Sequence, residues 1–290
     1  MTEIRTILFA SDLSSESDGA FEHARFLAER FGARLTIYHA VEMPRSEYEG
    51  VVDADEERRA RWERKVREEL QRRASTLTTP HEVVVQAAMV GGHFLVDLAV
   101  LDMIHRTRPD LTVMATRSRK GFASFFLGSV TEQVVQHAGR PVLCVRKAGD
   151  RAALPYQRVL VSTDFSPASR RAFPIATLMA RSFAAKVTAL HVVPPPRLAA
   201  LTGVPDAPLP RLPTEEELRR FLQPDFEGVP VEARVYATGA PWDRIVKAAE
   251  EQKADLVVMS TQGLDSLHDK VIGSNTERVL RHAPCSVLVT

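Results

Sequence analysis

The sequence predicts an α/β protein made of two tandem domains, each a doubly wound, open, five-stranded parallel sheet. Two observations lead to this fold class. The chain repeats itself once at a domain-sized interval, and within each repeat short runs of Val, Ile and Leu alternate with longer segments of helical period. Parallel strands have this continuously apolar character because helices cover both faces of their sheet.

The repeat is visible in four landmarks. ILFASDLSSES matches VLVSTDFSPAS, which pairs Asp12 with Asp164, and LTIYHAV matches VTALHVV at the same offset of 152 (164 − 12). PDLTVMATRS matches ADLVVMSTQG, and GSVTEQVVQHA matches GSNTERVLRHA, which pairs Gly128 with Gly273 at an offset of 145 (273 − 128). An offset that changes once indicates two homologous domains that differ in one intervening region. The predicted domains are residues 1–147 and 157–290, joined by the linker KAGDRAALPYQ.

The first repeat is predicted to contain five strands and four helices. Its apolar runs place the strands at about residues 4–10, 34–40, 82–88, 111–115 and 141–145. Segments of helical period place the helices at about residues 16–31, 54–77, 94–107 and 129–138. Ser14 or Ser15 is expected to cap the first helix. The long second helix has an apolar stripe beneath an Arg/Glu surface, which we interpret as a solvated face.

The second repeat follows the same plan with a different middle region. Its first helix carries Ala172, Ala176, Met179 and Phe183 on one face, as the matching helix of the first repeat does with its own apolar residues. The proline-rich segment VVPPPRLAALTGVPDAPLPRLPTEEELRRFL replaces the long second helix. Its prolines exclude a long helix until Thr214, which is expected to cap a short one.

Composition limits the partners of this chain. Its 290 residues carry 38 Lys and Arg against 37 Asp and Glu, and a formal net charge of +1 favours neither nucleic acid nor a membrane as a partner. No apolar run approaches the roughly 20 residues of a membrane span, and the N-terminal MTEIRTILFASD does not resemble a signal peptide. Cys144 and Cys285 lie in or beside apolar runs and are expected to be reduced thiols. We therefore expect a cytoplasmic protein.

The repeated landmarks fall at the carboxyl edge of the predicted sheets, where ligands of open α/β folds bind. Asp12 and Asp164 follow the first strand of each repeat, and Gly-Ser opens the last helix of each. A helix N-terminus offers unpaired amides and a partial positive charge to a phosphate, and glycine allows a close approach. The alternative is that Gly-Ser only caps the helix. Repetition does not decide between them, because a structural requirement is duplicated as faithfully as a function.

The whole chain resembles the universal stress protein family in its tandem form. The residues that carry the resemblance are TDFSPAS, ALHVV, ADLVVMSTQG and IGSNTERVLRHAPCSVLV in the second repeat. The resemblance implies a Rossmann-like fold of the adenine nucleotide alpha hydrolase type. Nucleotide-binding members have Gly, two residues, Gly, nine residues, then Gly and Ser or Thr. The second repeat has Ser260 in place of the first glycine, and the first repeat has Ala115 and Ser118 in place of the first two.

The resemblance implies ATP, ADP or AMP as the ligand, with or without Mg²⁺, bound chiefly in the second domain. Asp164 would contact the adenosine, and Val192 would meet the adenine through its main chain. The ribose and phosphates would be lined by Ser260, Gly263, Gly273, Ser274 and Asn275. The matching residues of a weaker first site are Asp12, Ala40, Ala115, Ser118, Gly128 and Ser129.

The replaced glycines are expected to weaken the first site. If those positions need left-handed backbone, each Cβ costs about 1–2 kcal/mol. The nearby cations Arg117, Arg119 and Lys120 would either restore anion binding or form a solvated loop.

Catalytic residues are not predicted. His39 and His191 end equivalent strands, and we interpret both as packed side chains whose ring N–H donates to a backbone carbonyl. No protein-bound metal site is expected, because no metal-ligand spacing occurs. The stretch Ser260–Gly263 contains no Lys or Arg, so any ATP hydrolysis is expected to be slow or incidental.

Three functions stay open at this point. The first is a cytoplasmic stress-response regulator or sensor that binds an adenine nucleotide and contacts an unidentified protein partner. The second is an interaction scaffold with two degenerate sites, paired as an internal pseudo-dimer through PVLCV and SVLVT, with or without a homodimer. The third is a small-molecule or lipid sensor, based on the apolar GFASFFLG segment, which otherwise forms a domain interface.

Overall fold

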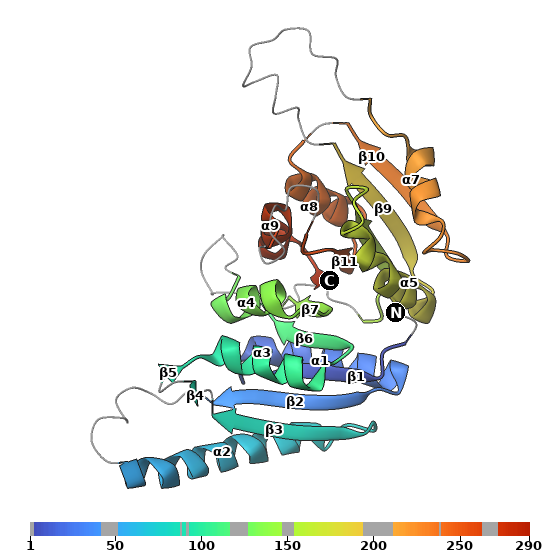
Figure 1. Cartoon of the computed structure of the whole chain (residues 1–290). Helices are drawn as coiled ribbons and strands as arrows, with labels where there is room; N and C mark the ends of the chain where they lie inside the picture. The colour runs from blue at the N-terminus through green and yellow to red at the C-terminus, as the bar shows by residue number, and fades with distance from the viewer. Residues whose placement is uncertain are drawn as a thin grey trace, which may run out of the picture. The chain divides into compact units, whose positions relative to one another are not determined.

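The computed structural model forms two compact units, Glu3–Ala148 and Gly149–Thr290, which are described one at a time (Figure 1). The structure describes residues 3–41, 52–87, 89–90, 93–116, 127–146, 154–193, 211–237, 239–262 and 272–290. Within these ranges, no helix combines the length and the apolar character that a membrane crossing requires.

The first unit is built on a five-stranded sheet in which each neighbouring pair is parallel. The strand order is β3-β2-β1-β6-β7. The strands are β1 (Thr6–Ala10), β2 (Arg34–Val41), β3 (His81–Ala87), β6 (Leu111–Ala115) and β7 (Val142–Val145). The helices are α1 (Ser15–Phe31), α2 (Val52–Ala74), α3 (Val96–Thr107) and α4 (Ser129–His137). Helix α1 packs on β1 and β6, and α2 packs on β3.

The second unit repeats this plan in the order β10-β9-β8-β11-β12, again with parallel neighbours. The strands are β8 (Arg158–Ser162), β9 (Lys186–Val192), β10 (Val231–Tyr236), β11 (Leu256–Met259) and β12 (Ser286–Val289). The helices are α5 (Phe173–Phe183), α7 (Glu215–Leu222), α8 (Pro241–Glu251) and α9 (Ser274–His282). The predicted fold class, two doubly wound parallel α/β sheets, is confirmed.

The strand order places a topological switch point in each unit. The second strand of each repeat lies on one side of the first strand and the fourth lies on the other. Connections therefore leave in opposite directions from the carboxyl ends of β1 and β6, and of β8 and β11. Ligands of open α/β sheets bind at this point.

Two elements differ from the prediction. A short antiparallel pair, β4 (Met89–Val90) and β5 (His93–Phe94), precedes α3, which consequently begins at Val96 instead of residue 94. In the second unit, a 3₁₀ turn η2 (Ser169–Ala172) leads into α5, which has a proline in its first two positions. Segments of two to four residues are too short for a hydrophobic period to reveal them.

The predicted cap at Thr214 is confirmed. The Thr214 hydroxyl accepts from the amide of Glu217 at 3.1 Å, and the Glu217 carboxylate accepts from the amide of Thr214 at 2.8 Å. The two bonds form a capping box. The bond from the Thr214 amide holds the pKa of Glu217 below its usual value.

The aspartates of the ADL and PDL landmarks anchor the amino ends of the first strands. Asp255, which is buried, accepts from the amides of Gln157 at 2.8 Å and Arg158 at 3.0 Å. Asp110 accepts in the same way from the amides of Arg5 and Thr6. Burial raises the pKa of Asp255, and the amide bonds partly offset that effect. This landmark therefore has a structural role at the edge opposite the switch point.

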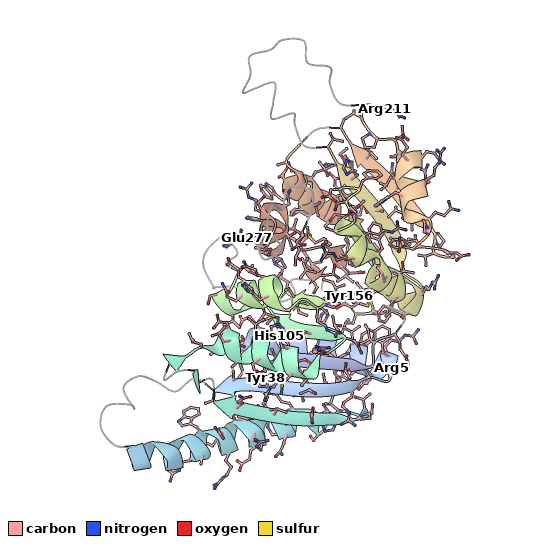
Figure 2. All side chains as sticks on the ribbon, in the orientation of Figure 1. Arg5, Tyr38, His105, Tyr156, Arg211 and Glu277 are labelled. Carbon is pink, nitrogen blue, oxygen red and sulfur yellow. The ribbon has the colours of Figure 1, made fainter. Side chains whose placement is uncertain are left out.

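The core of each unit is apolar, and each core contains one of the two cysteine thiols. Tyr38 is fully buried in the first unit and donates its hydroxyl to the carbonyl of Ala99 at 3.2 Å (Figure 2). Cys144 and Cys285 are buried and are not joined in a disulfide, and burial raises the pKa of Cys144 to about 12. That thiol is therefore protonated and unreactive at neutral pH.

Candidate functional site

In the second unit, the loop after β8 holds Asp164 in a hydrogen-bonded turn. Its carboxylate accepts from the amide of Ser166 at 3.0 Å. The Thr163 hydroxyl lies 2.8 Å from that of Ser169 and accepts from the amide of Phe165 at 3.1 Å. The Ser166 hydroxyl caps the following turn by accepting from the amide of Ser169 at 2.9 Å. These bonds fix the half-buried Asp164 at the carboxyl edge of the sheet.

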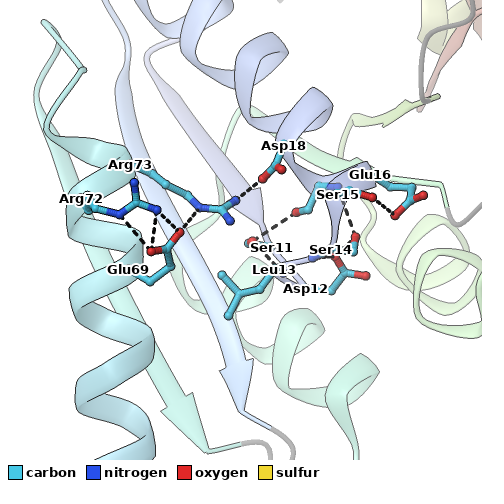
Figure 3. A network of polar contacts seen from close by, with 11 residues as sticks. Ser11, Asp12, Leu13, Ser14, Ser15, Glu16, Asp18, Glu69, Arg72 and Arg73 are labelled. Carbon is cyan, nitrogen blue, oxygen red and sulfur yellow. Dashed lines mark hydrogen bonds and ion pairs between the residues drawn. The ribbon is translucent and has the colours of Figure 1, made fainter.

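Figure 3 shows the equivalent loop of the first unit. The exposed Asp12 carboxylate accepts from the amide of Ser14 at 3.0 Å, and the Ser11 hydroxyl lies 3.1 Å from that of Ser17. Ser14 is the N-cap of α1 and accepts from the amide of Ser17 at 3.2 Å. Four hydrogen bonds of this loop recur in the second unit, so a structural role in closing the loop is a sufficient reason for the repeated Asp-x-Ser.

The residue after each aspartate has left-handed backbone. Leu13 has φ 58° and Phe165 has φ 63°, a conformation that costs about 1–2 kcal/mol for a residue with a Cβ. The Phe165 ring packs edge-on against His191 with centroids 4.8 Å apart, and against Phe221 at 5.1 Å. Beside it lies an open hollow of about 430 Å³. The hollow is lined by Phe165, Arg211, Leu212, Pro213, Glu217 and Phe221.

The two strand-end histidines connect neighbouring strands. His191 Nδ1 lies 2.9 Å from the carbonyl of Thr163, and His39 Nδ1 lies 2.8 Å from the carbonyl of Ser11. A carbonyl can only accept, so Nδ1 carries the proton in both. Burial lowers the pKa of each imidazole, and the bond to the carbonyl partly offsets it. The interpretation of both residues as packed histidines is confirmed.

Val192 directs its main chain toward the switch point. The amide of Thr163 donates to the carbonyl of Leu190 at 3.0 Å, whereas the amide of Val193 donates to Tyr236 on the opposite side at 3.0 Å. Because main-chain groups alternate in direction along a strand, Val192 faces the same side as Leu190. Strand β8 ends at Ser162, which pairs with Leu190, so it does not extend as far as Val192. The main chain of Val192 therefore faces the loop of Asp164.

Ser260 and its neighbours join the end of β11 to the last helix. Ser260 is buried, and its hydroxyl donates to the carbonyl of Thr290 at 3.4 Å and accepts from the amide of Gln262 at 3.3 Å. The Thr276 hydroxyl donates to the carbonyl of Ser260 at 2.9 Å. The amide of Thr261 donates to the carbonyl of Thr290 at 2.9 Å. These bonds hold the start of α9 against the end of β11.

Gly273 is needed for a close approach of two backbone segments. Its amide donates to the carbonyl of Thr261 at 2.8 Å, and a Cβ would lie 3.2 Å from that same oxygen. Its φ is −63°, so left-handed backbone is not the reason for glycine here. Helix α9 then begins at the exposed Ser274, and amides of its first turn lack acceptors within the helix. Asn275 accepts from the amide of Trp242 through its side-chain oxygen at 3.2 Å.

The matching residues of the first unit occupy equivalent places. The Thr131 hydroxyl donates to the carbonyl of Ala115 at 3.2 Å, and α4 begins at Ser129 after Gly128, whose φ is −61°. Ala40 lies near the end of β2 and is buried. The backbone frame of the two sites is therefore the same.

The sequence predicted strained, left-handed backbone at the replaced glycines. This prediction is wrong at the two replaced positions that the structure describes. Neither Ser260 nor Ala115 is among the described residues with positive φ, so their Cβ atoms bring no left-handed penalty. Gly263 and Ser118 lie outside the described residues, as do Arg117, Arg119, Lys120 and the phenylalanines of GFASFFLG.

Two features of the site were not predicted from the sequence. The threonine of each Thr-Glu pair fastens the last helix to the end of the fourth strand. In addition, Arg171 of η2 donates to the side-chain oxygen of Gln262 at 3.1 Å and so places a cation beside the end of β11. These residues are 91 positions apart, and no local spacing signals their contact.

Within the described ranges, no cluster of three or more His, Cys, Asp or Glu is arranged to hold a metal ion.

Comparison with known proteins assigns the family. The model of the universal stress protein family matches residues 3–146 and again residues 155–290. The chain belongs to the universal stress protein family. Because the model matches twice, it is a tandem universal stress protein. A universal stress protein of Thermus aquaticus is 31% identical over 135 residues, which cover 46% of this chain and 98% of that one. One of Methanocaldococcus jannaschii is 33% identical over 142 residues, 46% of this chain and 81% of that one.

Solved universal stress proteins share the architecture. A crystal structure from Archaeoglobus fulgidus covers 98% of this chain and 97% of its own, with a TM-score of 0.69 and 20% identity. That identity supports the fold alone. A universal stress protein solved in complex with cAMP is 28% identical over 47% of this chain and 96% of that one, with a TM-score of 0.34.

Proposed function

We propose that this tandem universal stress protein binds ATP, ADP or AMP in its second domain and acts as a regulator or sensor in the stress response. One observation carries the proposal. The turn of Asp164, the main chain of Val192 and the first turn of α9 all border the switch point of one sheet. Each supplies a group that a different part of an adenine nucleotide requires.

The chemistry of the three groups is complementary. The main chain of Val192 offers a donor and an acceptor to the edge of adenine, while the Asp164 carboxylate accepts from ribose hydroxyls. The start of α9 offers amides and a partial positive charge to phosphate. Glycine at position 273 lets α9 begin close to the end of β11, because a Cβ there would lie only 3.2 Å from the Thr261 carbonyl oxygen. Mg²⁺ would enter with the nucleotide phosphates.

The preference for the second domain depends on side chains. Both domains have the same loop turns, histidine bonds and threonine anchors. The second has a hydroxyl at Ser260 where the first has Ala115, and it keeps Gly263 where the first has Ser118. A lost donor and an added Cβ both disfavour phosphate in the first domain. Any hydrolysis would be slow, because the stretch Ser260–Gly263 contains no Lys or Arg to stabilise the charge that develops during phosphoryl transfer.

The proposal is tested by ATP titration calorimetry on the full chain, using one variant in each domain. Gly273→Val places a branched side chain against Thr261, and Gly128→Val makes the same change at the matching position of the first domain. We expect about one ATP bound per chain, lost in Gly273→Val and retained in Gly128→Val. Both variants must melt cooperatively for the comparison to hold. Equal ATP binding in all three proteins would remove the assigned site.

A scaffold without nucleotide is the second candidate. The observation in its favour is that Ser260 and Asn275 already bond within the protein, to Thr290 and to Trp242. Such residues need no ligand to explain them. In that case the wild-type chain would show no heat of ATP binding, and its melting temperature would not rise with ATP.

A further inference from the structure

We infer that Arg171 is the phosphate-binding cation of the second domain and makes the site selective for charged adenine nucleotides over adenosine. The inference rests on the proposed function and names a residue that the glycine-rich pattern does not contain. It depends on the place of Arg171 at the switch point, on its charge, and on the residue at the same position of the first domain.

The place of Arg171 follows from two hydrogen bonds and from the short stretch of chain that links them. Its guanidinium donates to the side chain of Gln262 at 3.1 Å. Gln262 follows Thr261, whose carbonyl accepts from the amide of Gly273 at 2.8 Å. Gly273 is the residue before α9 begins. The guanidinium and the first turn of α9 therefore flank the same short stretch of chain, where the proposed phosphates lie.

The charge of Arg171 is not neutralised by a described carboxylate. Its partner Gln262 is an uncharged amide, and the side chain of Arg171 is exposed. The neighbouring Arg170 differs, because its Nε lies 2.6 Å from the Asp225 carboxylate and its guanidinium lies over the Phe221 ring at 5.7 Å. Arg170 is thus used to hold the fold. Arg171 can exchange a neutral acceptor for a phosphate, which arginine binds in two-pronged geometry.

The first domain lacks this cation. The offset of 152 that relates the loops after β1 and β8 places Gly19 opposite Arg171 (171 − 152 = 19). Gly19 is an exposed residue of α1, and a Cβ there would meet nothing within 4 Å, so space does not demand glycine. The two domains consequently share a frame but differ at this position of the first helical segment, where the second domain has a cation and the first has glycine. That difference is a second reason to expect nucleotide in the second domain.

The test compares the affinities of ATP and adenosine for the full chain by calorimetry. In Arg171→Gln, we expect ATP to bind roughly tenfold to a hundredfold more weakly, as for loss of a charged hydrogen bond, and adenosine to bind as before. Arg171→Lys should recover part of the ATP affinity. The matched control is Arg170→Gln, which removes a neighbouring charge of the same sign and should leave the ratio of the two affinities unchanged.

The outcomes separate this inference from the proposed function. If the wild type binds ATP and Arg171→Gln binds it equally well, the inference is wrong and the proposed site stands. If Arg171→Gln loses adenosine as much as ATP, Arg171 only supports the structure of the site, and the inference is again wrong. If the wild type binds neither ATP nor adenosine, both fail.

Discussion

Hydroxyl side chains at the carboxyl edge form a frame that is the same in both domains. Thr163 bonds to Ser169 as Ser11 bonds to Ser17, at 2.8 and 3.1 Å. Such bonds cap helices and close loops without any ligand. The residues that repeat in both domains therefore have mainly a structural role. Differences in binding between the domains depend on the few positions that do not repeat.

Substitutions of Asp164 can separate its structural role in the turn from its proposed role in nucleotide binding. Asp164→Asn keeps an oxygen for the amide of Ser166 and removes the negative charge. We expect a smaller decrease in the free energy of unfolding than in Asp164→Ala, and ATP binding weaker by about 1 kcal/mol, because an amide is the weaker acceptor from ribose hydroxyls. Asp164→Ala also loses the turn and should lower the free energy of unfolding by about 1 kcal/mol. Urea unfolding and ATP titration measure the two effects.

The first domain supplies the control for that experiment. Asp12→Asn makes the same change in the equivalent turn and should leave ATP affinity unaltered. If Asp12→Asn and Asp164→Asn weakened ATP binding equally, the assignment of the site to the second domain would be contradicted.

At the scale of elements, the first helices of the two domains differ in one buried group. His23 of α1 is 4% exposed, and burial lowers its pKa from 6.5 to about 4. The offset of 152 places the buried Ile175 of α5 at the matching position (175 − 23 = 152). One domain thus has a titratable residue where the other has an apolar one.

This difference predicts how the stability of the first domain changes with pH. The unfolded chain binds a proton on His23 below pH 6.5 and the folded chain does so only near pH 4, so stability is full above pH 6.5 and falls as the pH drops. Between pH 7.5 and 5 the loss from this residue is about 2 kcal/mol. His23→Ile should reduce the loss by that amount, measured by urea unfolding at both pH values. An identical pH dependence in the variant would show that His23 titrates normally.

The long elements were predictable from the sequence, and the short ones were not. Strand β2 and helix α1 were each placed within one residue of their ends, because a buried parallel strand is an unbroken apolar run and α1 has a serine cap and an apolar stripe. The β4–β5 pair and the η2 turn are too short to show a period. The N-cap residue of η2 is Ala168, which has no polar side chain that could indicate the start of the 3₁₀ turn.

The candidate site was predictable only as a location. Topology places residues that follow parallel strands at one edge, so Asp164, Val192 and Ser260 could be brought together from sequence alone. Bonds between distant residues could not be predicted, such as Asn275 with Trp242 and Arg171 with Gln262, which are 33 and 91 positions apart. The expectation of left-handed backbone at Ser260 was wrong, because Ser260 is not among the described residues with positive φ. The role of each residue in binding stays a prediction.

At the scale of the whole molecule, the chain contains one fold twice with unequal chemistry. Both repeats match the family model, and both sheets end in the same hydrogen-bonded loops. Ser260 and Arg171 have no counterpart in the first domain, where Ala115 and Gly19 stand. The account therefore predicts one nucleotide per chain instead of two. The limits of the domains at residues 147 and 157 stay a prediction as well.

The central claim is tested most directly by a crystal structure of the full chain grown with saturating ATP. The account predicts electron density for the nucleotide at the carboxyl ends of β8 and β11, with its base at Val192, its sugar at Asp164 and its phosphates between Arg171 and Ser274. The matching place in the first domain should hold no nucleotide. Density for ATP only in the first domain, or an empty second domain in crystals that contain ATP, would contradict the account.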